Sequence, residues 1–341
     1  MMERIRLGII GIGHRGKALI RATQAAGQAD IIALADPLLR ARREGTKLAD
    51  NAQMYERWED MIGSERLDGV VIALPNHLHC DAAVAALREN LSVFCEKPIA
   101  PSIAEVDQIA AAAQQSKGIF QVGLEFRYAP WATDLARALA QGIIGIPKMM
   151  WCHEFRPPFR YGEGGWRMDK QLSGGTFLEK TVHHFDLFNW FSGSKPLRVY
   201  AVGENDTIYS DKTILDRAWV IVEYENRMSA QLGLCLFYHR KTLQLGLLGT
   251  EGSVQIDGIE KVVDIESRFR SIRWSYNADG MGTSAGNFEH PGEVEQQVAF
   301  AEAVRTGCSP VANLTVARGA HVLSAAAEQA VETGKVVVLS E

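Results

Sequence analysis

Three glycines near the amino terminus have the spacing of a loop that binds the phosphates of a dinucleotide. Gly11, Gly13 and Gly16 lie in the segment LGIIGIGHRG, directly after an apolar run and at the head of a predicted helix over residues 17–26. The first glycine allows a tight turn, the second lets the backbone approach a pyrophosphate, and the third lets the helix pack on the strand. We therefore predict cofactor contacts from Gly11, Ile12, Gly13, His14, Arg15 and Gly16.

A carboxylate follows at the position where such a fold binds the adenosine ribose. Asp36 ends the second apolar run, 20 residues after Gly16. An acidic residue there accepts a hydrogen bond from the ribose 2′-hydroxyl and repels a 2′-phosphate. Arg40, Arg42 and Arg43 stand just downstream, and nearby arginines accommodate a 2′-phosphate. The pattern favours NAD and leaves NADP as the alternative cofactor.

A second group of polar residues stands where another apolar run stops. The stretch SVFCEKPIA, residues 92–100, begins like a buried strand and then sets Glu96, Lys97 and Pro98 side by side. Taken alone, this stretch is consistent with a surface turn, because proline restricts the preceding residue to extended geometry and charges favour solvent. A carboxylate and an amine together at a strand end are also suited to a binding site.

A predicted helix over residues 176–191 carries a histidine between acidic residues. Glu179, His183 and Asp186 fall at i, i+4 and i+7 in GGTFLEKTVHHFDLFNW, so one helix face presents all three. His184 points about 100° away, and we interpret it as structural or peripheral. A histidine flanked by carboxylates suits proton transfer, but on spacing alone it could also be a core residue whose hydrogen bonds are satisfied.

The elements that must position these residues change in type along the chain. Up to residue 123, short runs rich in Ile, Val and Leu alternate with Ala-rich helical stretches, which predicts parallel βαβ units. After Arg127, long alternating segments such as RAWVIVEYE predict a meander of antiparallel strands. The fold class expected is α/β, with an N-terminal Rossmann doubly wound parallel sheet in residues 1–125 and a C-terminal α+β domain in residues 126–341. The second domain should contain a large, mostly antiparallel sheet.

The composition excludes several classes of protein. A net charge of −5 and a pI near 6.0 lack the basic surplus of a nucleic-acid binder. The five cysteines are scattered and contain no Cys-x-x-Cys pair, so they indicate a reducing cytoplasm rather than a disulfide framework or a zinc site. No apolar stretch approaches the roughly 20 residues of a membrane helix. A chain of 341 residues is expected to form two domains with a small-molecule partner.

With the glycine loop, LPNHLHCD (residues 74–81), CEKP and GGTFLEKTVHHFDLFNW together, the sequence resembles the glucose-fructose oxidoreductase / inositol dehydrogenase / rhizopine catabolism (Gfo/Idh/MocA) family. In that family the Glu-Lys-Pro turn sits over the nicotinamide and its lysine is catalytic, which the resemblance carries to Lys97. It also implies that the Lys97–Pro98 bond is cis. Nicotinamide-side contacts are expected from Leu74, Pro75, Asn76, His79, Glu96 and Lys97. One departure is Glu179, since the family has aspartate at this position.

The resemblance implies an NAD(P)-dependent oxidoreductase that transfers a hydride between nicotinamide and a secondary alcohol or ketone of a sugar, inositol or related polyol. The hydroxyl must lose its proton, so a base has to lie within hydrogen-bond reach. We assign this role to His183, because a histidine pKa of about 6.5 suits it, whereas a lysine pKa of about 10.4 would first have to be lowered. Lys97 then stabilises the developing alkoxide, and Glu179 orients the imidazole or relays its proton.

Substrate contacts are expected from segments rich in Arg, Tyr, Trp and His. Hydroxylated rings need bidentate polar contacts and an aromatic platform. If Lys97 and His183 act on one oxygen, their nitrogens should lie within roughly 6 Å of each other. The substrate candidates are Arg127, Tyr128, Trp166, Arg167, His183 and His290.

Other readings stay open at this point. A redox-neutral glycoside hydrolase of the same wider family would retain NAD during catalysis. A sensor that binds nucleotide without chemistry has no need of Lys97 together with His183. The spacing of His77, His79 and Asp81 also suits a metal site, but these residues match the family's nicotinamide-side loop and we predict no metal. An open sheet in the second domain would expose a face that a second copy covers, so a homodimer or homotetramer is expected.

Overall fold

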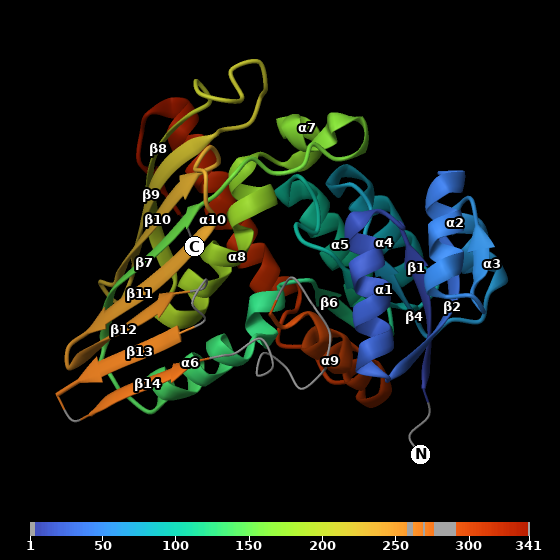
Figure 1. The fold of residues 1–341 in the computed structure, drawn as a ribbon, viewed down its shortest axis with the longest axis horizontal. Helices are drawn as coiled ribbons and strands as arrows, with labels where there is room; N and C mark the ends of the chain where they lie inside the picture. The colour runs from blue at the N-terminus through green and yellow to red at the C-terminus, as the bar shows by residue number, and fades with distance from the viewer. Residues whose placement is uncertain (1–3, 258–261, 269, 276–290, 340–341) are drawn as a thin grey trace. The chain divides into compact units, whose positions relative to one another are not determined.

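The computed structural model describes residues 4–257, 262–268, 270–275 and 291–339 (Figure 1). The chain divides into two compact units. The first comprises Met1–Ala129 and Gly282–Arg318, and the second comprises Pro130–Met281 and Gly319–Glu341. Within the described ranges, no helix combines the length and the apolar character needed to cross a bilayer.

The sheet of the first unit is parallel throughout its described strands. The strands lie in the order β3-β2-β1-β4-β5-β6. This order reverses direction between β1 and β4, and ligands of such sheets bind outside the carboxyl ends of the strands at that point. The strands are β1 (Ile5–Ile10), β2 (Ala29–Ala35), β3 (Gln53–Tyr55), β4 (Gly69–Ile72), β5 (Ser92–Cys95) and β6 (Phe120–Val122).

Helices cover both faces of this sheet because its strands carry apolar side chains on both sides. Ile9 points to a core shared with Leu19, whereas the next residue, Ile10, points to a core shared with Ala83. The doubly wound parallel sheet predicted from the sequence is therefore confirmed. The first face is covered by α1 (His14–Ala26), α2 (Leu39–Leu48) and α9 (Glu293–Thr306), and the second by α3 (Trp58–Ser64), α4 (His79–Arg88) and α5 (Ile103–Gln115).

The position of α9 differs from the continuous second domain expected over residues 126–341. Although α9 comes late in the chain, it belongs to the first unit. Phe300 is fully buried against Phe94 of β5, with ring centroids 5.8 Å apart, and Ala301 lies in the same core. Burial of one phenylalanine contributes about 1.5–3 kcal/mol, which holds this helix on the parallel sheet.

The second unit has a larger, mostly antiparallel sheet, as the sequence predicted. Its described strands lie in the order β14-β13-β12-β11-β7-β10-β9-β8-β15. Neighbouring strands are antiparallel except β7 and β10, which are parallel. The strands are β7 (Pro147–Phe155), β8 (Pro196–Glu204), β9 (Arg217–Tyr224), β10 (Ser229–Cys235), β11 (Thr242–Gly249), β12 (Gly252–Asp257), β13 (Val262–Ser267), β14 (Ser271–Ser275) and β15 (Val337–Val338).

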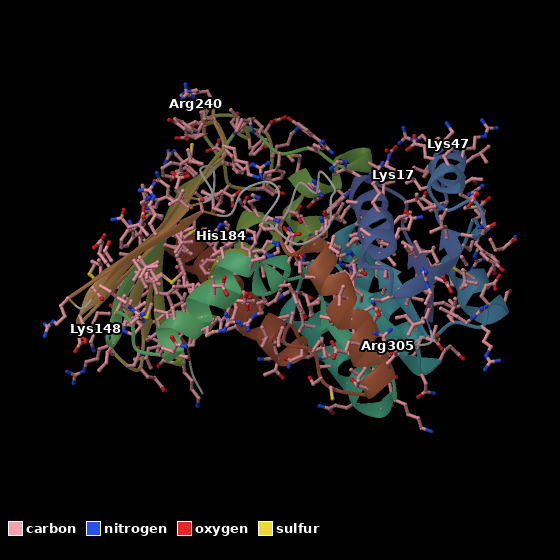
Figure 2. All side chains as sticks on the ribbon, turned by 60° about the horizontal axis from the view of Figure 1, so that its bottom comes forward. Lys17, Lys47, Lys148, His184, Arg240 and Arg305 are labelled. Carbon is pink, nitrogen blue, oxygen red and sulfur yellow. The ribbon has the colours of Figure 1, made fainter. Side chains whose placement is uncertain are left out.

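Helices lie on one side of this sheet, and α8 (Thr176–Ser192) is the most buried of them. Figure 1 shows α6 (Pro130–Ala140) and α8 on the same side of the strands. Most α8 side chains are buried, including Phe177 and Phe185. Figure 2 shows Lys148 of β7 projecting outward, whereas His184 of α8 is only 1% exposed. The unit also contains α7 (Lys170–Ser173) and the part of α10 (Leu314–Thr333) that follows residue 318.

Candidate active site

The glycine loop follows β1 at the carboxyl edge of the parallel sheet. Gly11 has a left-handed φ of +91°, and a Cβ there would lie 2.6 Å from the Ala73 carbonyl oxygen. A Cβ at Gly16 would lie 1.9 Å from the Gly11 carbonyl oxygen, so both glycines are needed for the loop to pack. A Cβ at Gly13 would meet no atom within 4 Å. Gly13 therefore keeps the approach to the α1 N-terminus clear, which fits a bound pyrophosphate.

Asp36 stands at the carboxyl end of β2 beside the glycine loop. Its two carboxylate oxygens accept hydrogen bonds of 2.8 Å from the backbone N–H groups of Ile12 and Leu38. Each oxygen has a further lone pair that can accept a ribose hydroxyl. Arg42 donates to the carbonyl oxygens of Asp36 and Pro37 and pairs with Glu56. The guanidinium of Arg42 is thus bound to groups of the protein itself, which favours NAD over NADP.

The Lys97 turn follows β5, and the predicted nicotinamide-side loop follows β4, its neighbour in the sheet. The Lys97–Pro98 bond is cis, as predicted. The ring of His79, the first residue of α4, holds the two loops together. Its Nδ1 lies 2.7 Å from the Pro98 carbonyl oxygen, and its Nε2 lies 2.8 Å from the Leu74 carbonyl oxygen. Both ring nitrogens face backbone carbonyls, so this histidine is not placed to bind a metal ion.

The first unit brings the predicted cofactor residues to one edge of the sheet. The glycine loop follows β1, the Asn76 3-10 turn η1 (Asn76–Leu78) follows β4, and Lys97 follows β5. Two predicted cofactor side chains bind each other, because the Nε of Arg15 donates to Glu96 at 2.6 Å. The edge therefore contains Gly11, Ile12, Gly13, His14, Arg15, Gly16, Asp36, Leu74, Pro75, Asn76, His79, Glu96 and Lys97.

The predicted catalytic face of α8 lies in the second unit and is buried. Glu179 and His183 are 6% and 7% exposed, and Asp186 is 1% exposed. Glu179 Oε1 lies 3.1 Å from the Nε of Arg167, a residue that we predicted as a substrate contact. Arg167 therefore neutralises the carboxylate that is expected to orient His183. Because Lys97 belongs to the first unit and His183 to the second, their convergence on one oxygen stays a prediction.

A second ionic cluster on α8 was not predicted from the sequence. Glu154 of β7 is buried, and it pairs with Lys180 at 2.7 Å and with the Nε2 of His184 at 3.0 Å. Burial alone raises the pKa of Glu154, but Lys180 and the His184 hydrogen bond hold it well below its usual value. The only sequence signals were an acid inside the apolar stretch MMWCHEF and the i, i+4 spacing of Lys180 and His184. His184 is thus structural, in agreement with the prediction.

The substrate candidates divide between the two units. Arg127 and Tyr128 lie in the 3-10 turn η2 (Glu125–Tyr128) of the first unit, where Tyr128 packs in the core and its hydroxyl accepts the Ala312 N–H at 3.4 Å. Trp166 and Arg167 lie in η3 (Glu163–Met168) of the second unit, with the guanidinium 5.1 Å from the indole centre. His290 lies outside the described residues.

Comparison with known proteins gives the family. Residues 5–124 match the model of the oxidoreductase family with an NAD-binding Rossmann fold, and residues 133–255 match the GFO/IDH/MocA C-terminal domain. The rhizopine catabolism protein MocA of Rhizobium meliloti is 31% identical over 198 residues, which cover 57% of this chain and 59% of that protein. The inositol 2-dehydrogenase of Salmonella paratyphi B is 27% identical over 224 residues, which cover 64% of this chain and 63% of that protein.

Another relative and a solved structure extend the comparison. The 2,7-anhydro-N-acetylneuraminate hydratase of Mediterraneibacter gnavus is 25% identical over 264 residues, 75% of this chain and 68% of that protein. The crystal structure of myo-inositol 2-dehydrogenase from Lactobacillus plantarum has the same fold, with a TM-score of 0.85 at 23% identity, over 99% of this chain and 100% of that chain. Both domain models name one family, so the chain belongs to the Gfo/Idh/MocA oxidoreductase family, with an NAD-binding Rossmann domain as the sequence predicted.

Proposed function

We propose that the protein is an NAD-dependent dehydrogenase that transfers a hydride between nicotinamide and a secondary alcohol or ketone of an inositol, a related polyol or a sugar. The observation that carries this proposal is the Lys97 turn, which stands after β5 at the same sheet edge as the glycine loop. The relative named inositol 2-dehydrogenase supports a cyclic polyol as the substrate class. The matched segments span 59% of the length of MocA and 63% of the length of this inositol 2-dehydrogenase.

The proposed chemistry divides among three side chains, and a fourth holds one of them in place. When bound, the nicotinamide ring accepts or donates the hydride. His183 takes the proton of the reacting hydroxyl as general base, and Lys97 donates a hydrogen bond to the same oxygen and stabilises its negative charge. Glu179 orients the His183 ring, and Arg167, whose Nε lies 3.1 Å from Glu179 Oε1, holds that carboxylate in place. The same groups act in reverse when a ketone is reduced.

A substrate panel tests this function and separates it from the redox-neutral alternative. Inositols, aldoses and glycosides are each incubated with NAD or NADP, and the absorbance of the reduced nicotinamide is followed. We expect stoichiometric NADH from at least one inositol or sugar. Cleavage of a glycoside with no net NADH and with NAD still bound would support the redox-neutral reading instead. Nucleotide binding without any turnover would support the sensor. The hydratase among the relatives makes the redox-neutral arm of this assay worth including.

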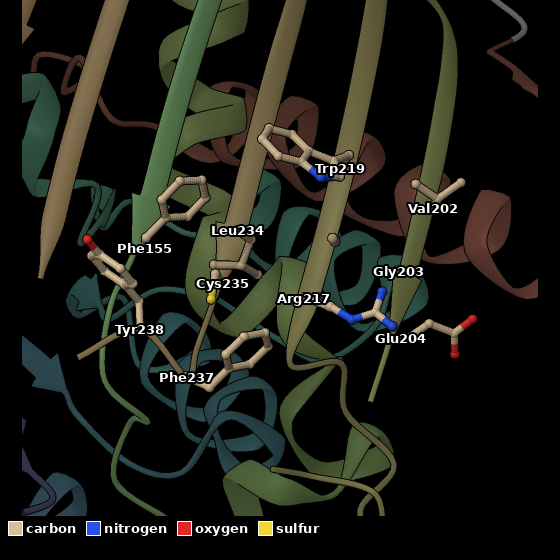
Figure 3. A pocket seen from close by; sticks show the side chains of 11 residues that line it. Phe155, Val202, Gly203, Glu204, Arg217, Trp219, Leu234, Cys235, Phe237 and Tyr238 are labelled. Carbon is tan, nitrogen blue, oxygen red and sulfur yellow. The ribbon is translucent and has the colours of Figure 1, made fainter. Parts of the chain in front are cut away.

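We propose further that a second copy of the chain covers the exposed face of the larger sheet, as a homodimer or homotetramer. Val202 and Trp219 are partners on β8 and β9 and are 66% and 46% exposed. Figure 3 shows Trp219 near the aromatic side chains of Phe155, Phe237 and Tyr238. These residues line a hollow of about 500 Å³. A Cβ at Gly233 would lie 2.5 Å from Trp219, so this glycine lets the indole lie flat on the sheet. Exposed apolar surfaces of this kind mark interaction sites.

Light scattering tests the oligomer. We expect a dimer or tetramer for the wild type and a smaller species for Trp219→Glu, because a charge at the centre of an apolar interface is costly. An unchanged mass for the variant, or a monomeric wild type at micromolar concentration, would contradict the proposal.

The described part of the chain contains free cysteines only, which agrees with the cytoplasmic location proposed from their spacing.

A further inference from the structure

We infer that Glu96, held by Arg15, is the residue that positions Lys97, an inference that rests on the proposed catalytic role of Lys97. One carboxylate oxygen of Glu96 accepts the Nε–H of Arg15 at 2.6 Å. The other accepts the backbone N–H of Lys97 at 3.1 Å. A continuous chain of hydrogen bonds therefore runs from the first turn of α1, at the glycine loop, to the backbone of Lys97. This chain fixes the Lys97 turn relative to the loop expected to bind the cofactor pyrophosphate.

Arg15 is anchored from three sides, which makes it a rigid support for Glu96. Besides Glu96, its guanidinium pairs with Glu125 at 2.8 Å and with Glu293 of α9. The side chains of all three glutamates are at most 6% exposed. Burial lowers the pKa of Arg15, but the three carboxylates raise it by more than burial lowers it. The guanidinium therefore stays charged. A planar cation with nitrogens in a fixed fork holds its partners in one geometry better than a flexible amine would.

The absence of a side chain at Gly123 leaves room for the Glu96 carboxylate. Gly123 follows β6, and a Cβ there would lie 3.1 Å from the carboxylate carbon and from Oε1 of Glu96. A Cβ at position 123 would therefore be in tight contact with the carboxylate, which would have to shift relative to Arg15 and Lys97. On the other side of the turn, the carbonyl of Pro98 is bound by His79. Lys97 is therefore held through both of its neighbours in the chain.

The test compares Glu96→Gln with Glu293→Gln. Each variant removes one negatively charged partner of the Arg15 guanidinium, but only Glu96→Gln also changes the acceptor of the Lys97 N–H. An amide has one oxygen, so the side chain introduced by Glu96→Gln can accept from Arg15 or from Lys97 and not from both. We expect Glu96→Gln to lower kcat by about 10–100-fold, the usual scale for partners that orient a reactive group, and to change the Kd of NAD little. Glu293→Gln leaves the hydrogen bond between Glu96 and the Lys97 N–H in place, so we expect it to keep kcat within about twofold of the wild type.

An activity-independent measurement separates this inference from the proposed function. Hydrogen exchange of the Lys97 amide should be about tenfold faster in Glu96→Gln, because the single amide oxygen is drawn to the charged Arg15 donor and leaves the Lys97 N–H, and unchanged in Glu293→Gln. If the wild type oxidised no polyol, the proposed function would fail while the exchange rates still tested the link. Wild-type protection of the Lys97 amide in Glu96→Gln would overturn the inference, as would equal losses of kcat in both variants. Gly123→Ala, which displaces the carboxylate without changing charge, should reproduce both effects if Glu96→Gln does not fold.

Discussion

The two groups of candidate residues are held by different forces. In the first unit they stand at the ends of β1, β2, β4 and β5, where glycine geometry, backbone hydrogen bonds and the Arg15–Glu96 pair fix the loops. In the second unit Glu179 and His183 stand on the buried helix α8, where Arg167 pairs with Glu179 and where Glu154 pairs with the neighbouring Lys180 and His184. Loops at the end of a parallel sheet can bind ligands with neutral backbone groups, whereas ionisable side chains inside a helix core need partners of opposite charge.

The largest expected effect is the loss of turnover when the proposed base, His183, or its partner, Lys97, is replaced. His183→Ala should lower turnover by about 10²–10⁴-fold, the scale of general acid/base catalysis, and leave the Kd of NAD nearly unchanged. Lys97→Ala should lose turnover on the same scale. If both side chains act on one oxygen, the double variant should lose little more than either single variant. Steady-state kinetics with the best polyol measures this. Fully additive losses would contradict their action on a common oxygen.

Because buried charges in the second unit depend on their partners, we expect that removing one of these charges lowers the stability of the fold and not only the activity. Glu154→Ala leaves Lys180 and His184 without their carboxylate, so the free energy of unfolding should fall by about 3 kcal/mol, toward the lower end for a broken buried pair because Lys180 is partly exposed. Urea denaturation measures this. The control is Glu223→Ala, which breaks the exposed pair with Arg198 and should change stability little. Similar losses in both variants would contradict the special role of the buried cluster.

The same cluster gives a pH dependence of defined sign. Its partners hold the pKa of Glu154 well below the ordinary value of 4.5. A carboxyl with a lowered pKa in the folded protein contributes stability fully above its unfolded pKa, and the contribution is lost as pH falls through the folded pKa. The stability difference between wild type and Glu154→Gln should thus be constant at neutral pH and shrink below pH 4.5. A difference that grows on acidification would contradict this assignment.

A smaller effect, on the affinity for NAD, is expected from a change at Gly13, in the glycine loop that we expect to bind the cofactor through its backbone. Gly13→Val should fold normally, because a Cβ at this position meets no atom within 4 Å, yet the branched side chain should block the pyrophosphate. We expect the Kd of NAD to rise by at least about tenfold, a loss of about 1.4 kcal/mol. Calorimetric titration and thermal unfolding give the two readouts. Gly16→Ala is the matched contrast, since its Cβ would clash with the loop itself and lower stability.

The same distinction explains what the sequence could predict. The glycine loop, Asp36 and the Lys97 turn depend on residues close in sequence and on strand ends that a parallel sheet brings together, so their arrangement follows from the pattern. The partners of the buried charged residues, by contrast, cannot be predicted from the sequence pattern. Arg15 and Glu293 are 278 positions apart, and no local signal indicates that α9 returns to the first unit. Likewise, the pairing of Arg167 with Glu179 depends on how η3 folds back on α8, which no local sequence signal indicates.

The smallest expected effect concerns the choice between NAD and NADP at Asp36. Its carboxylate already accepts two backbone N–H groups and would add the ribose 2′-hydroxyl, so Asp36→Ala should weaken NAD binding by about tenfold, the value of one hydrogen bond to a charged acceptor. The same change removes the repulsion of a 2′-phosphate, and NADP should gain relative to NAD. The gain should be modest in this variant, because Arg42 is bound to backbone carbonyls and to Glu56 rather than turned to the ribose. Fluorescence titration of both cofactors against wild type and variant measures the ratio. Tighter NADP than NAD binding by the wild type would show that the arginines after Asp36, and not its carboxylate, decide the cofactor.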